Sequence, residues 1–341
     1  MVTSRDVARV AGVSQATVSR VLQNSVHVKD STRQRVLAAL KDVGYTPNAN
    51  ARAMRTRRTG TIGIVMECVT NPFYPELLET LSRELASVSM RMILWLSEGE
   101  AELSAVEAIH ENRADGVIFT TVREGSTALN EAIETRAPFV LVNRTVQGLT
   151  CDQVSSDNFE GARAVGRYFL LHGHKDVAVI CGLPGVSTNG DRLDGFLAAN
   201  REAGGSLKSH YVVSGDFTHQ HGVEAFHRLM ALKTPPTAIF CVNDLIALGV
   251  LDAARTLGVR IPQDVWIVGY DDIDMASWPS HDLSTVKQRL DDMARAAVEL
   301  LLQRIAEPER APSFLRFPSQ LVIRGSTNCQ PYKQLGVLDL P

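Results

Sequence analysis

Three short stretches near the start of the chain place apolar residues at the spacing of a helix. The first follows Thr3-Ser4-Arg5-Asp6, a Ser/Thr-x-x-Asp/Glu pattern in which Thr3 can accept hydrogen bonds from first-turn amides. Gly12 ends this helix because glycine adopts a left-handed turn at little cost, and Ser14 is suited to cap a second helix over residues 15–22. A third helix is predicted over residues 30–43. The residues that the last two helices should bury are Val18, Val21 and Leu22, then Val36, Leu37 and Leu40.

The small residue Ala8, the turn at Gly12 and the aliphatic Val18 have the spacing of a helix-turn-helix. A purely structural helical hairpin is the alternative, because many hairpins share this pattern. Charge favours DNA binding: residues 1–58 hold eleven basic and three acidic side chains, a net charge of +8, whereas the remainder has a net charge of −11. Such an asymmetry is typical of a nucleic-acid-binding head on an acidic body.

The second helix of a helix-turn-helix begins in the major groove of DNA. Gln15 can pair with N6 and N7 of adenine, Arg20 with O6 and N7 of guanine or with phosphate, and Ala16 can contact a thymine methyl group. The other residues of this segment that we expect at the DNA are Thr3, Ser14, Thr17, Ser19, Asn24 and His27.

Short apolar runs alternate with helical stretches through the rest of the chain, which predicts parallel sheets covered on both faces. Strands are predicted at 61–66, 92–96, 116–119, 139–142, 177–181, 238–242 and 265–270, with helices near 75–89, 101–112 and 126–136 between the first four. Two such units predict an α/β body of two Rossmann-like subdomains with a cleft between them.

Polar residues follow several of these strands, at the end of a parallel sheet where ligands bind. Asn243-Asp244 and Asp271-Asp272 each close a predicted strand, and we expect Arg192 to open a helix. For Asp244 and Asp272 the simpler interpretation is helix capping or orientation of a neighbour, and capping alone is also an alternative for Asn243 and Asp271.

Sugars need planar polar groups for paired hydroxyls and an aromatic ring for their apolar face. Arg192, Asn243 and Asp271 supply the first, and Phe73 or Phe217 the second. A purine effector is the alternative, because aromatic walls and arginine also suit a base.

The composition is that of an ordinary globular protein, with 341 residues, 45% hydrophobic and 21% charged. It contains no apolar run long enough to span a membrane. Gly185 to Gly190 has the glycine spacing of a phosphate loop, but Asp191-Arg192 stands where Lys-Ser/Thr is required. The pairs His172/His174 and His219/His221 lack a nearby acidic or cysteine partner. We therefore expect no enzymatic activity, no metal and no cofactor.

Eight segments carry a resemblance to a known family, in the family's order over residues 3–326: SRDVARVAGVSQATVSRVL, VGYTPNANARAMRTRRTGTIGIV, NPFYPELL, GHKDVAVICG, GDRLDGF, VNDLIALGVL, IPQDVWIVGYDDIDMASW and LSTVKQ. The chain resembles the lactose/galactose repressor (LacI/GalR) family of bacterial transcription factors. By this resemblance Arg192 matches the effector-binding arginine, Asn243 and Asp271 the polar ligands, Phe217 the aromatic wall, and Gln288 a contact from a connecting segment.

The resemblance implies a small all-α helix-turn-helix domain over 1–46, joined by a hinge helix and linker over 47–60 to an effector-binding and dimerisation domain over 61–330. A tail over 331–341 follows. The body would be a periplasmic-binding-protein-like pair, with subdomains of 61–156 plus 288–318 and of 157–287 plus 319–330. The chain would cross between them near 155–160, 285 and 315–325.

The hinge region of the chain is short, polar and rich in arginine. In the family the hinge helix orders when two copies meet in the minor groove, and a leucine from each wedges into a base step and kinks the DNA. Met54 stands at the matching position, and we expect Asn48, Arg52 and Met54 to contact DNA. A disordered basic tether is the alternative.

These observations predict a sequence-specific repressor, controlled by a small molecule, that binds a near-palindromic operator as a homodimer. Arg5, Asp6 and Arg9 stand where a secretory leader needs apolar residues, so we expect the protein in the cytoplasm. The remaining alternatives are a sugar-binding transport protein with the same body, which that missing leader disfavours, and a sugar-using enzyme.

Overall fold

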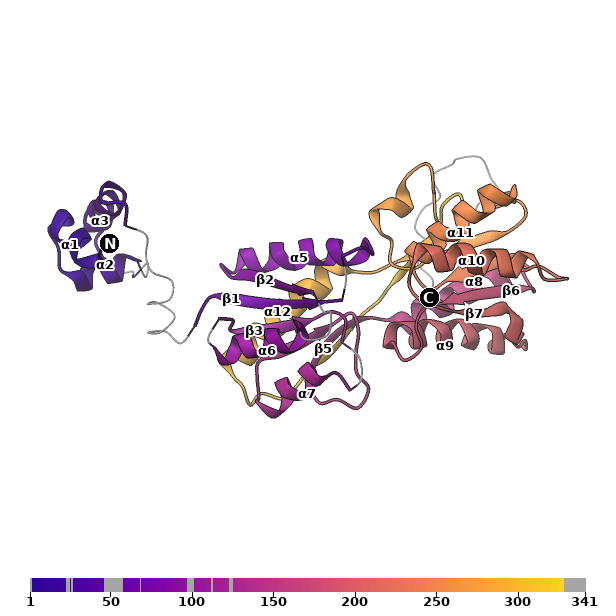
Figure 1. Cartoon of the computed structure of the whole chain (residues 1–341), viewed down its shortest axis with the longest axis horizontal. Helices are drawn as coiled ribbons and strands as arrows, with labels where there is room; N and C mark the ends of the chain where they lie inside the picture. Colours follow the sequence, from indigo (N-terminus) through magenta and orange to yellow (C-terminus); the bar gives the residue numbers. More distant parts are fainter. Residues whose placement is uncertain are drawn as a thin grey trace. The chain divides into compact units, whose positions relative to one another are not determined.

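The computed structural model describes residues 2–22, 25, 27–45, 58–67, 69–96, 101–111, 113–122 and 125–327. The chain divides into two compact units, Met1–Thr59 and Gly60–Pro341, which we call the head and the body (Figure 1). Among the described residues, no helix combines the length and the apolar character needed to cross a membrane.

The described part of the head contains the helices α1 (Ser4–Ala11), α2 (Gln15–Leu22) and α3 (Asp30–Asp42). The start of α1 is fixed by the Asp6 carboxylate, which accepts the backbone N–H of Thr3 at 3.0 Å. The turn at Gly12 has φ 61°, and Ser14 Oγ accepts the N–H of Thr17 at 3.2 Å, which confirms the predicted cap of α2. The head core contains Val7, Ala8, Ala11, Val18, Val21, Val36 and Ala39.

One predicted core position in the head is wrong. Leu37 is 51% exposed, and Ala39 is buried instead. The inner face of α3 consists of Val36, Ala39, Leu40 and Val43. These residues have the i, i+3, i+4, i+7 spacing of one helix face, and Leu37 lies about 100° around the helix from Val36.

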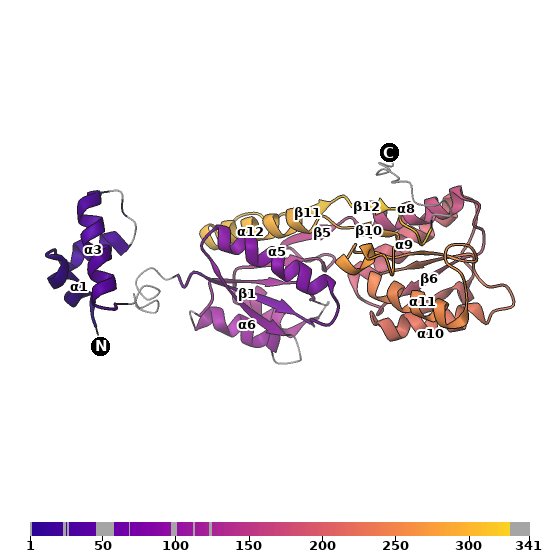
Figure 2. The same ribbon diagram turned by 90° about the horizontal axis from the view of Figure 1, so that it is seen from above.

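One of the two halves of the body, which we call the N-terminal subdomain, is built on a six-stranded sheet. Its strand order is β11-β5-β4-β3-β1-β2, and all neighbouring strands are parallel. Its strands are β1 (Thr61–Met66), β2 (Arg91–Leu96), β3 (Gly116–Phe119), β4 (Phe139–Val142), β5 (Asp152–Ser156) and β11 (Phe314–Phe317). Helices α5 (Phe73–Ser87) and α12 (Leu290–Ala306) cover one face, and α6 (Ala101–His110) and α7 (Thr127–Glu134) cover the other (Figures 1 and 2).

The second half, called the C-terminal subdomain, has a parallel sheet of order β7-β6-β8-β9. Its strands are β6 (Val177–Cys181), β7 (Val212–Ser214), β8 (Ala238–Cys241) and β9 (Trp266–Val268). Helix α8 (Asn158–Leu171) packs with α9 (Ser187–Glu202), and α10 (His219–Met230) packs with α11 (Asp244–Leu257). Two short 3₁₀ helices, η1 (Ser209–Tyr211) and η2 (Asp274–Ser277), complete it.

Three segments connect the subdomains and run side by side in Figure 2. The first leads from β5 to α8, the second from β10 (Thr285–Lys287) to α12, and the third from β11 to β12 (Gln320–Val322). β10 and β12 pair with each other in antiparallel fashion. The chain therefore enters each subdomain more than once, and residues far apart in sequence meet where the segments pass.

The structure confirms the predicted strands β1, β3, β4 and β6 at their bounds. β9 is shorter than predicted, because the chain after Val268 turns toward β10. There the N–H groups of Gly269 and Asp271 donate to the carbonyls of Ser284 and Val286, both at 2.9 Å.

Helices α10 and α11 approach so closely that only glycine fits at their contact. A Cβ atom on Gly222 would lie 2.1 Å from the carbonyl oxygen of Ile246, and one on Gly249 would lie 2.0 Å from that of His219. A Cβ atom on Gly190 in α9 would meet no atom within 4 Å.

Gly222→Ala should therefore destabilise the body by about 1–3 kcal/mol, because the helices must move apart. The matched variant Gly190→Ala should stabilise it by about 0.5–1 kcal/mol, the helix preference for alanine over glycine. Urea unfolding of the two variants gives both values, and equal effects at the two sites would contradict the packing argument.

Candidate functional site

A cavity of about 250 Å³ lies between the two subdomains of the body. Its walls contain five of the residues predicted to bind an effector: Phe73, Arg192, Phe217, Asn243 and Asp271. The N-terminal subdomain adds Glu67, Thr70, Asn71, Tyr74, Asn143 and Arg144, and the C-terminal subdomain adds Leu183, Thr188, Asp216, Thr218 and Leu245. The cavity is therefore lined from both sides.

Arg192 is a buried cation with a partner for each of its nitrogens. Its Nε donates to Asn158 Oδ1 at 2.8 Å and its Nη1 to the carbonyl of Val242 at 2.6 Å. Its Nη2 lies 3.1 Å from Asp271 Oδ1, and the guanidinium stacks 3.7 Å from the ring centroid of Tyr270. The expectation that Arg192 opens a helix is wrong, because α9 begins at Ser187 and Arg192 lies in its second turn.

Asp271 meets Arg192 from the end of β9. Its side chain is buried, and Oδ1 also accepts Gln288 Nε2 at 2.7 Å. Burial raises the pKa of Asp271 to about 6, although Arg192 and Gln288 act in the opposite direction. The backbone of Asp271 has φ 120°, which is rare for a residue with a side chain. Unfavourable conformations of this kind cluster at ligand sites.

Asn243 caps a helix with its side-chain oxygen, and its side-chain nitrogen is left without a partner. Its Oδ1 accepts the N–H of Ile246 at 3.0 Å, so it caps α11. Its Nδ2 is buried and has no hydrogen-bond partner. A buried unsatisfied donor is costly, and this one belongs to a residue of the cavity wall, where a ligand oxygen can accept from it.

Asp244 and Asp272 turn away from the cavity. Asp244 is fully buried and accepts the N–H of Ile273 at 3.0 Å and the hydroxyl of Thr285. Burial and the neighbouring Asp271 raise the pKa of Asp244 well above its usual range. Asp272 pairs with Arg324 at 2.6 Å. Both therefore orient neighbouring segments, as the simpler interpretation held.

The two aromatic residues lie on opposite walls. Phe217 belongs to the loop between β7 and α10, and its ring occupies the space that a Cβ atom on Gly182 would take. Phe73 is the first residue of α5, and its buried ring meets Tyr74 edge to face with centroids 5.4 Å apart.

Two charged residues of the N-terminal subdomain were missed by the sequence analysis. Arg144 is buried, and its Nη2 lies 2.8 Å from Glu67 Oε2 and donates to the Tyr74 hydroxyl at 3.1 Å. A sequence signal existed: Asn143-Arg144 follows β4 as Asn243-Asp244 follows β8. Burial raises the pKa of Tyr74, so its hydroxyl remains protonated at neutral pH.

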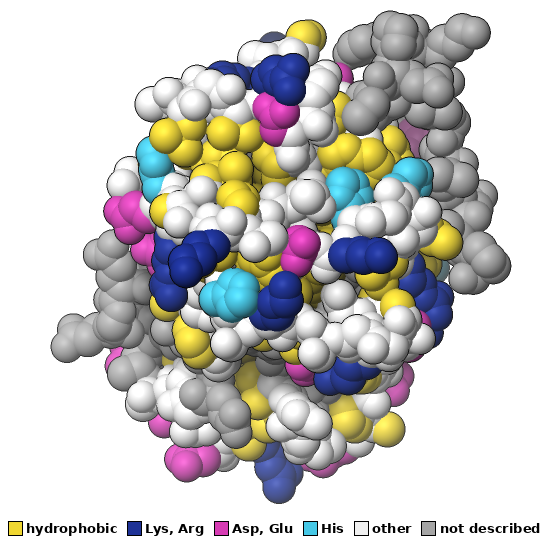
Figure 3. Space-filling view, turned by 90° about the vertical axis from the view of Figure 1, so that its right-hand side faces the viewer, with side chains coloured by type: hydrophobic (Ala, Val, Ile, Leu, Met, Phe, Trp, Pro, Cys, Tyr) yellow, Lys and Arg dark blue, Asp and Glu magenta, His cyan; other side chains and the backbone are white. Residues whose placement is uncertain are grey.

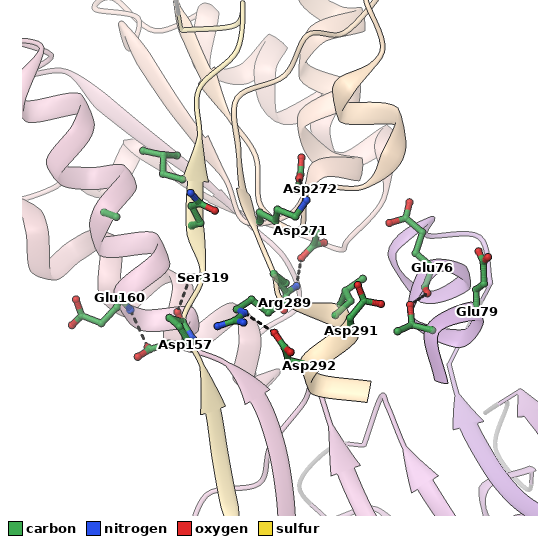
Figure 4. Close-up of a pocket in the computed structure, with 18 of the residues that line it drawn as sticks. Glu76, Glu79, Asp157, Glu160, Asp271, Asp272, Arg289, Asp291, Asp292 and Ser319 are labelled. Atoms are coloured by element: carbon green, nitrogen blue, oxygen red, sulfur yellow. Dashed lines mark hydrogen bonds and ion pairs between the residues drawn. The ribbon is translucent and has the colours of Figure 1, made fainter. Parts of the chain in front are cut away.

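Gln288 does not line the cavity. It lines a neighbouring groove of about 1210 Å³ that shares Asp271 with the cavity (Figure 4). Acidic side chains from α5 and from the start of α12 face this groove, among them Glu76, Glu79 and Asp291. Direct contact between Gln288 and an effector stays a prediction, and in this structure Gln288 acts on the cavity through Asp271.

The head presents the start of α2 to solvent. Gln15, Ala16 and Arg20 are exposed, as are Thr3, Ser14 and His27, whereas Thr17 and Ser19 are half-buried. Gln15 Nε2 donates to Ser4 Oγ at 2.8 Å, which holds its amide at the junction of α1 and α2. Asn24, Asn48, Arg52 and Met54 lie outside the described residues, as does most of the predicted hinge.

On the outer end of the C-terminal subdomain, the described residues form no continuous basic surface. Figure 3 shows basic, acidic and histidine side chains interspersed there with neutral ones.

Residues 3–48 match the family model of bacterial regulatory proteins of the lacI family, and residues 167–327 match that of a periplasmic binding protein-like domain. The chain is 31% identical over 331 residues to the probable HTH-type transcriptional repressor ExuR of Bacillus subtilis (strain 168), covering 96% of this chain and 98% of that one.

Two solved structures extend the comparison. A complex of the transcriptional regulator CelR with cellobiose has a TM-score of 0.74 and 29% identity, covering 96% of this chain and 100% of the other. The lac repressor dimer bound to operator and the anti-inducer ONPF has a TM-score of 0.83 and 25% identity, covering 96% and 99%.

The raised pKa of Asp271 predicts a pH dependence of stability. The folded protein holds this proton up to about pH 6, whereas an unfolded aspartate loses it near pH 4. The contribution of Asp271 is therefore most favourable below about pH 4 and is lost as pH rises to about 6, with a slope of up to about 1.4 kcal/mol per pH unit.

Asp271→Asn should remove this part of the slope, measured by urea unfolding between pH 4 and 7. The exposed Asp291 provides the control, because Asp291→Asn should leave the slope unchanged. Equal slopes in the parent and in Asp271→Asn would contradict the assignment.

Proposed function

The chain belongs to the lacI family of bacterial regulatory proteins, and we propose that it is a repressor whose operator affinity is controlled by a sugar or sugar derivative bound in the cavity of its body. The head is a DNA-binding helix-turn-helix, and the body is a periplasmic binding protein-like effector domain. A regulator that acts on operator DNA works in the cytoplasm.

The observation that carries the proposal is the polar edge formed by Arg192, Asn243 and Asp271. Guanidinium and amide groups donate hydrogen bonds, and the carboxylate accepts them, so neighbouring hydroxyls can each find a partner. The free Nδ2 of Asn243 supports a ligand at this edge, because its desolvation is uncompensated in the protein alone.

The size of the cavity and its aromatic residues support a ligand with a small ring. Its volume of about 250 Å³ is below the range of about 300–1,000 Å³ common for drug-sized ligands. Phe217 provides a flat apolar surface for the face of a sugar ring. Similarity to a regulator solved with cellobiose further favours a carbohydrate.

The proposed assembly is a homodimer on a near-palindromic operator. β2 forms an edge of the N-terminal subdomain sheet, and its apolar residues Ile93 and Leu96 are exposed. An exposed apolar edge strand favours association, so we propose that a second copy of the chain buries this edge in a dimer interface. The similar lac repressor binds its operator as a dimer.

Operator binding should depend on Gln15. With operators selected from random DNA by the full-length protein, Gln15→Ala should weaken specific binding by about 1–3 kcal/mol and relax the preference at one base pair per half-site. The matched variant Gln34→Ala, on the exposed part of α3, should bind as the parent does. Fluorescence anisotropy measures both affinities.

The same titrations at two salt concentrations test the electrostatic part. Affinity should fall steeply as salt rises, because several Arg and Lys side chains displace counterions from DNA. A flat salt response, or equal losses from Gln15→Ala and Gln34→Ala, would contradict the assignment of the head surface.

Effector binding should depend on Arg192 and Asp271. Screening sugars, polyols, sugar acids and purines by thermal shift should identify a stabilising ligand. Replacing Arg192 or Asp271 by alanine should weaken binding of this ligand by about 1–3 kcal/mol, because a buried partner is left unpaired. Arg295→Ala, at an exposed arginine of α12, is the control.

The stabilising ligand must also change operator affinity and remain chemically intact. Normal ligand binding by both alanine variants would contradict the assignment of the cavity. If the stabilising ligand is a purine, a purine replaces the sugar as the proposed effector. If the protein chemically converts the ligand, the alternative of a sugar-using enzyme is favoured.

A further inference from the structure

Two arginine side chains line this small cavity from opposite subdomains. Arg192 comes from α9 and Arg144 follows β4, and each side chain is only 4% exposed. A buried cation requires charged or hydrogen-bonding partners, because an unpaired charge is costly to desolvate. The partners of the two arginines differ, and this difference indicates which cation is open to a ligand.

The surroundings of Arg192 are fixed. Its Nε and Nη1 donate to Asn158 and to the carbonyl of Val242, and its Nη2 pairs with Asp271. Asp271 is itself only 5% exposed and is held by Gln288. A ligand carboxylate could replace Asp271 only by leaving that buried charge without its partner. Arg192 and Asp271 therefore suit neutral hydroxyl groups.

Arg144 is positioned by neutral groups as well as by a carboxylate. Its Nη1 donates to the carbonyl of Thr121 at 2.9 Å, and its Nη2 donates to the hydroxyl of Tyr74 at 3.1 Å. These two bonds keep the guanidinium in place when its carboxylate partner changes. That partner is Glu67 at 2.8 Å, whose side chain is 34% exposed.

Glu67 can therefore leave Arg144 more easily than Asp271 can leave Arg192. Its side chain already reaches solvent, so turning outward restores hydration to the carboxylate. Glu67 also lies immediately after β1, where the chain has left the sheet. The Arg144–Glu67 pair is thus open to exchange with another carboxylate.

We infer that the effector carries a carboxylate, which replaces that of Glu67 on Arg144. This inference rests on the proposed function of the cavity as the effector site. Arginine binds a carboxylate through two parallel hydrogen bonds that are stronger than those to neutral acceptors. The hydroxyls of the same ligand then face Arg192, Asn243 and Asp271. The ligand class is a sugar acid of monosaccharide size.

Besides Glu67 and Asp271, the cavity wall contains one more carboxylate, that of Asp216, and it does not oppose a ligand carboxylate on Arg144. Asp216 belongs to the C-terminal subdomain, and Oδ1 accepts the N–H of Thr218 at 3.1 Å and the hydroxyl of the same residue. Its charge is therefore engaged within its own loop. A sugar acid placed with its carboxylate on Arg144 carries neutral hydroxyls toward this side.

The exchange can be tested without knowing the stereochemistry of the effector. Glu67→Ala removes the resident carboxylate and leaves Arg144 in need of an anion, so acetate should restore part of the lost stability. In the full-length protein, the melting temperature of Glu67→Ala should rise by about 2–4 °C more in acetate than in chloride of equal ionic strength. The parent should show no such difference.

The matched control is Glu309→Ala, which removes a carboxylate from the exposed pair with Arg136. Acetate should not stabilise it selectively. If Glu67→Ala does not fold, Glu67→Gln keeps the side-chain volume while removing the charge and is measured in the same way. No selective gain in acetate, or an equal gain in the control or the parent, would overturn the inference.

A second experiment compares hexoses with the hexuronic acids that differ from them only at C6. The acid of a binding pair should stabilise the full-length protein at a concentration at least tenfold lower than its neutral partner requires. Arg144→Gln should abolish this preference, whereas Arg136→Gln should keep it. If the neutral member binds equally well, the inference fails while the sugar-controlled repressor stands. Failure of the full-length protein to select any operator would instead overturn the proposed function.

Discussion

The buried ion pair between Arg192 and Asp271 is the interaction on which the ligand cavity depends. It joins helix α9 to the end of β9, and Gln288 ties it to the segment that leads into α12. Burying two ions costs several kcal/mol of desolvation for each, on the order of what their attraction returns. Apolar side chains would serve stability as well, and Asp271 also carries an unfavourable φ. The pair is therefore better explained by the polar edge that it offers to a ligand.

Between residues that the structure describes, hydrogen bonds join the two subdomains beside this cavity. The N–H of Thr145 donates to Ser187 Oγ at 3.0 Å, and the N–H of Asp274 donates to Glu76 Oε1 at 2.9 Å. Direct contacts of this kind must change when the subdomains move about the three connecting segments. A ligand held by both walls adds contacts that exist in one arrangement, so it shifts the equilibrium toward that arrangement. This differential binding is the physical basis of the proposed effector control.

The polar pairs at the strand ends divide their roles in a regular way. Asn243 and Asp271 line the cavity, whereas Asp244 and Asp272, the second residues of these pairs, bond to neighbouring segments of the protein. Successive side chains leaving a strand point in different directions, so one reaches the ligand and the next supports the backbone. Asn143-Arg144 departs from this rule, because both residues line the cavity. The N-terminal wall of the cavity consequently contains a charged side chain, Arg144, where the rule predicts a residue that turns away from the ligand.

The sequence by itself determined the elements and their order, because these follow from local periodicity. The strands β1, β3, β4 and β6, the caps of α1 and α2, and the alternation that requires two covered parallel sheets are all encoded within a few neighbouring residues. The strand-end pattern singled out Arg192, Asn243 and Asp271, the resemblance over residues 3–326 matched them to effector contacts, and all three do line one cavity. Only the tertiary structure decided which faces are buried and which charges meet. Leu37 faces solvent because the contacts of α3 select a different stripe, and Gln288 acts through Asp271 because of where its connecting segment passes. The meeting of Arg144 with Glu67 joins residues after two different strands. Such a pair depends on the order of strands in the sheet, which no local pattern specifies.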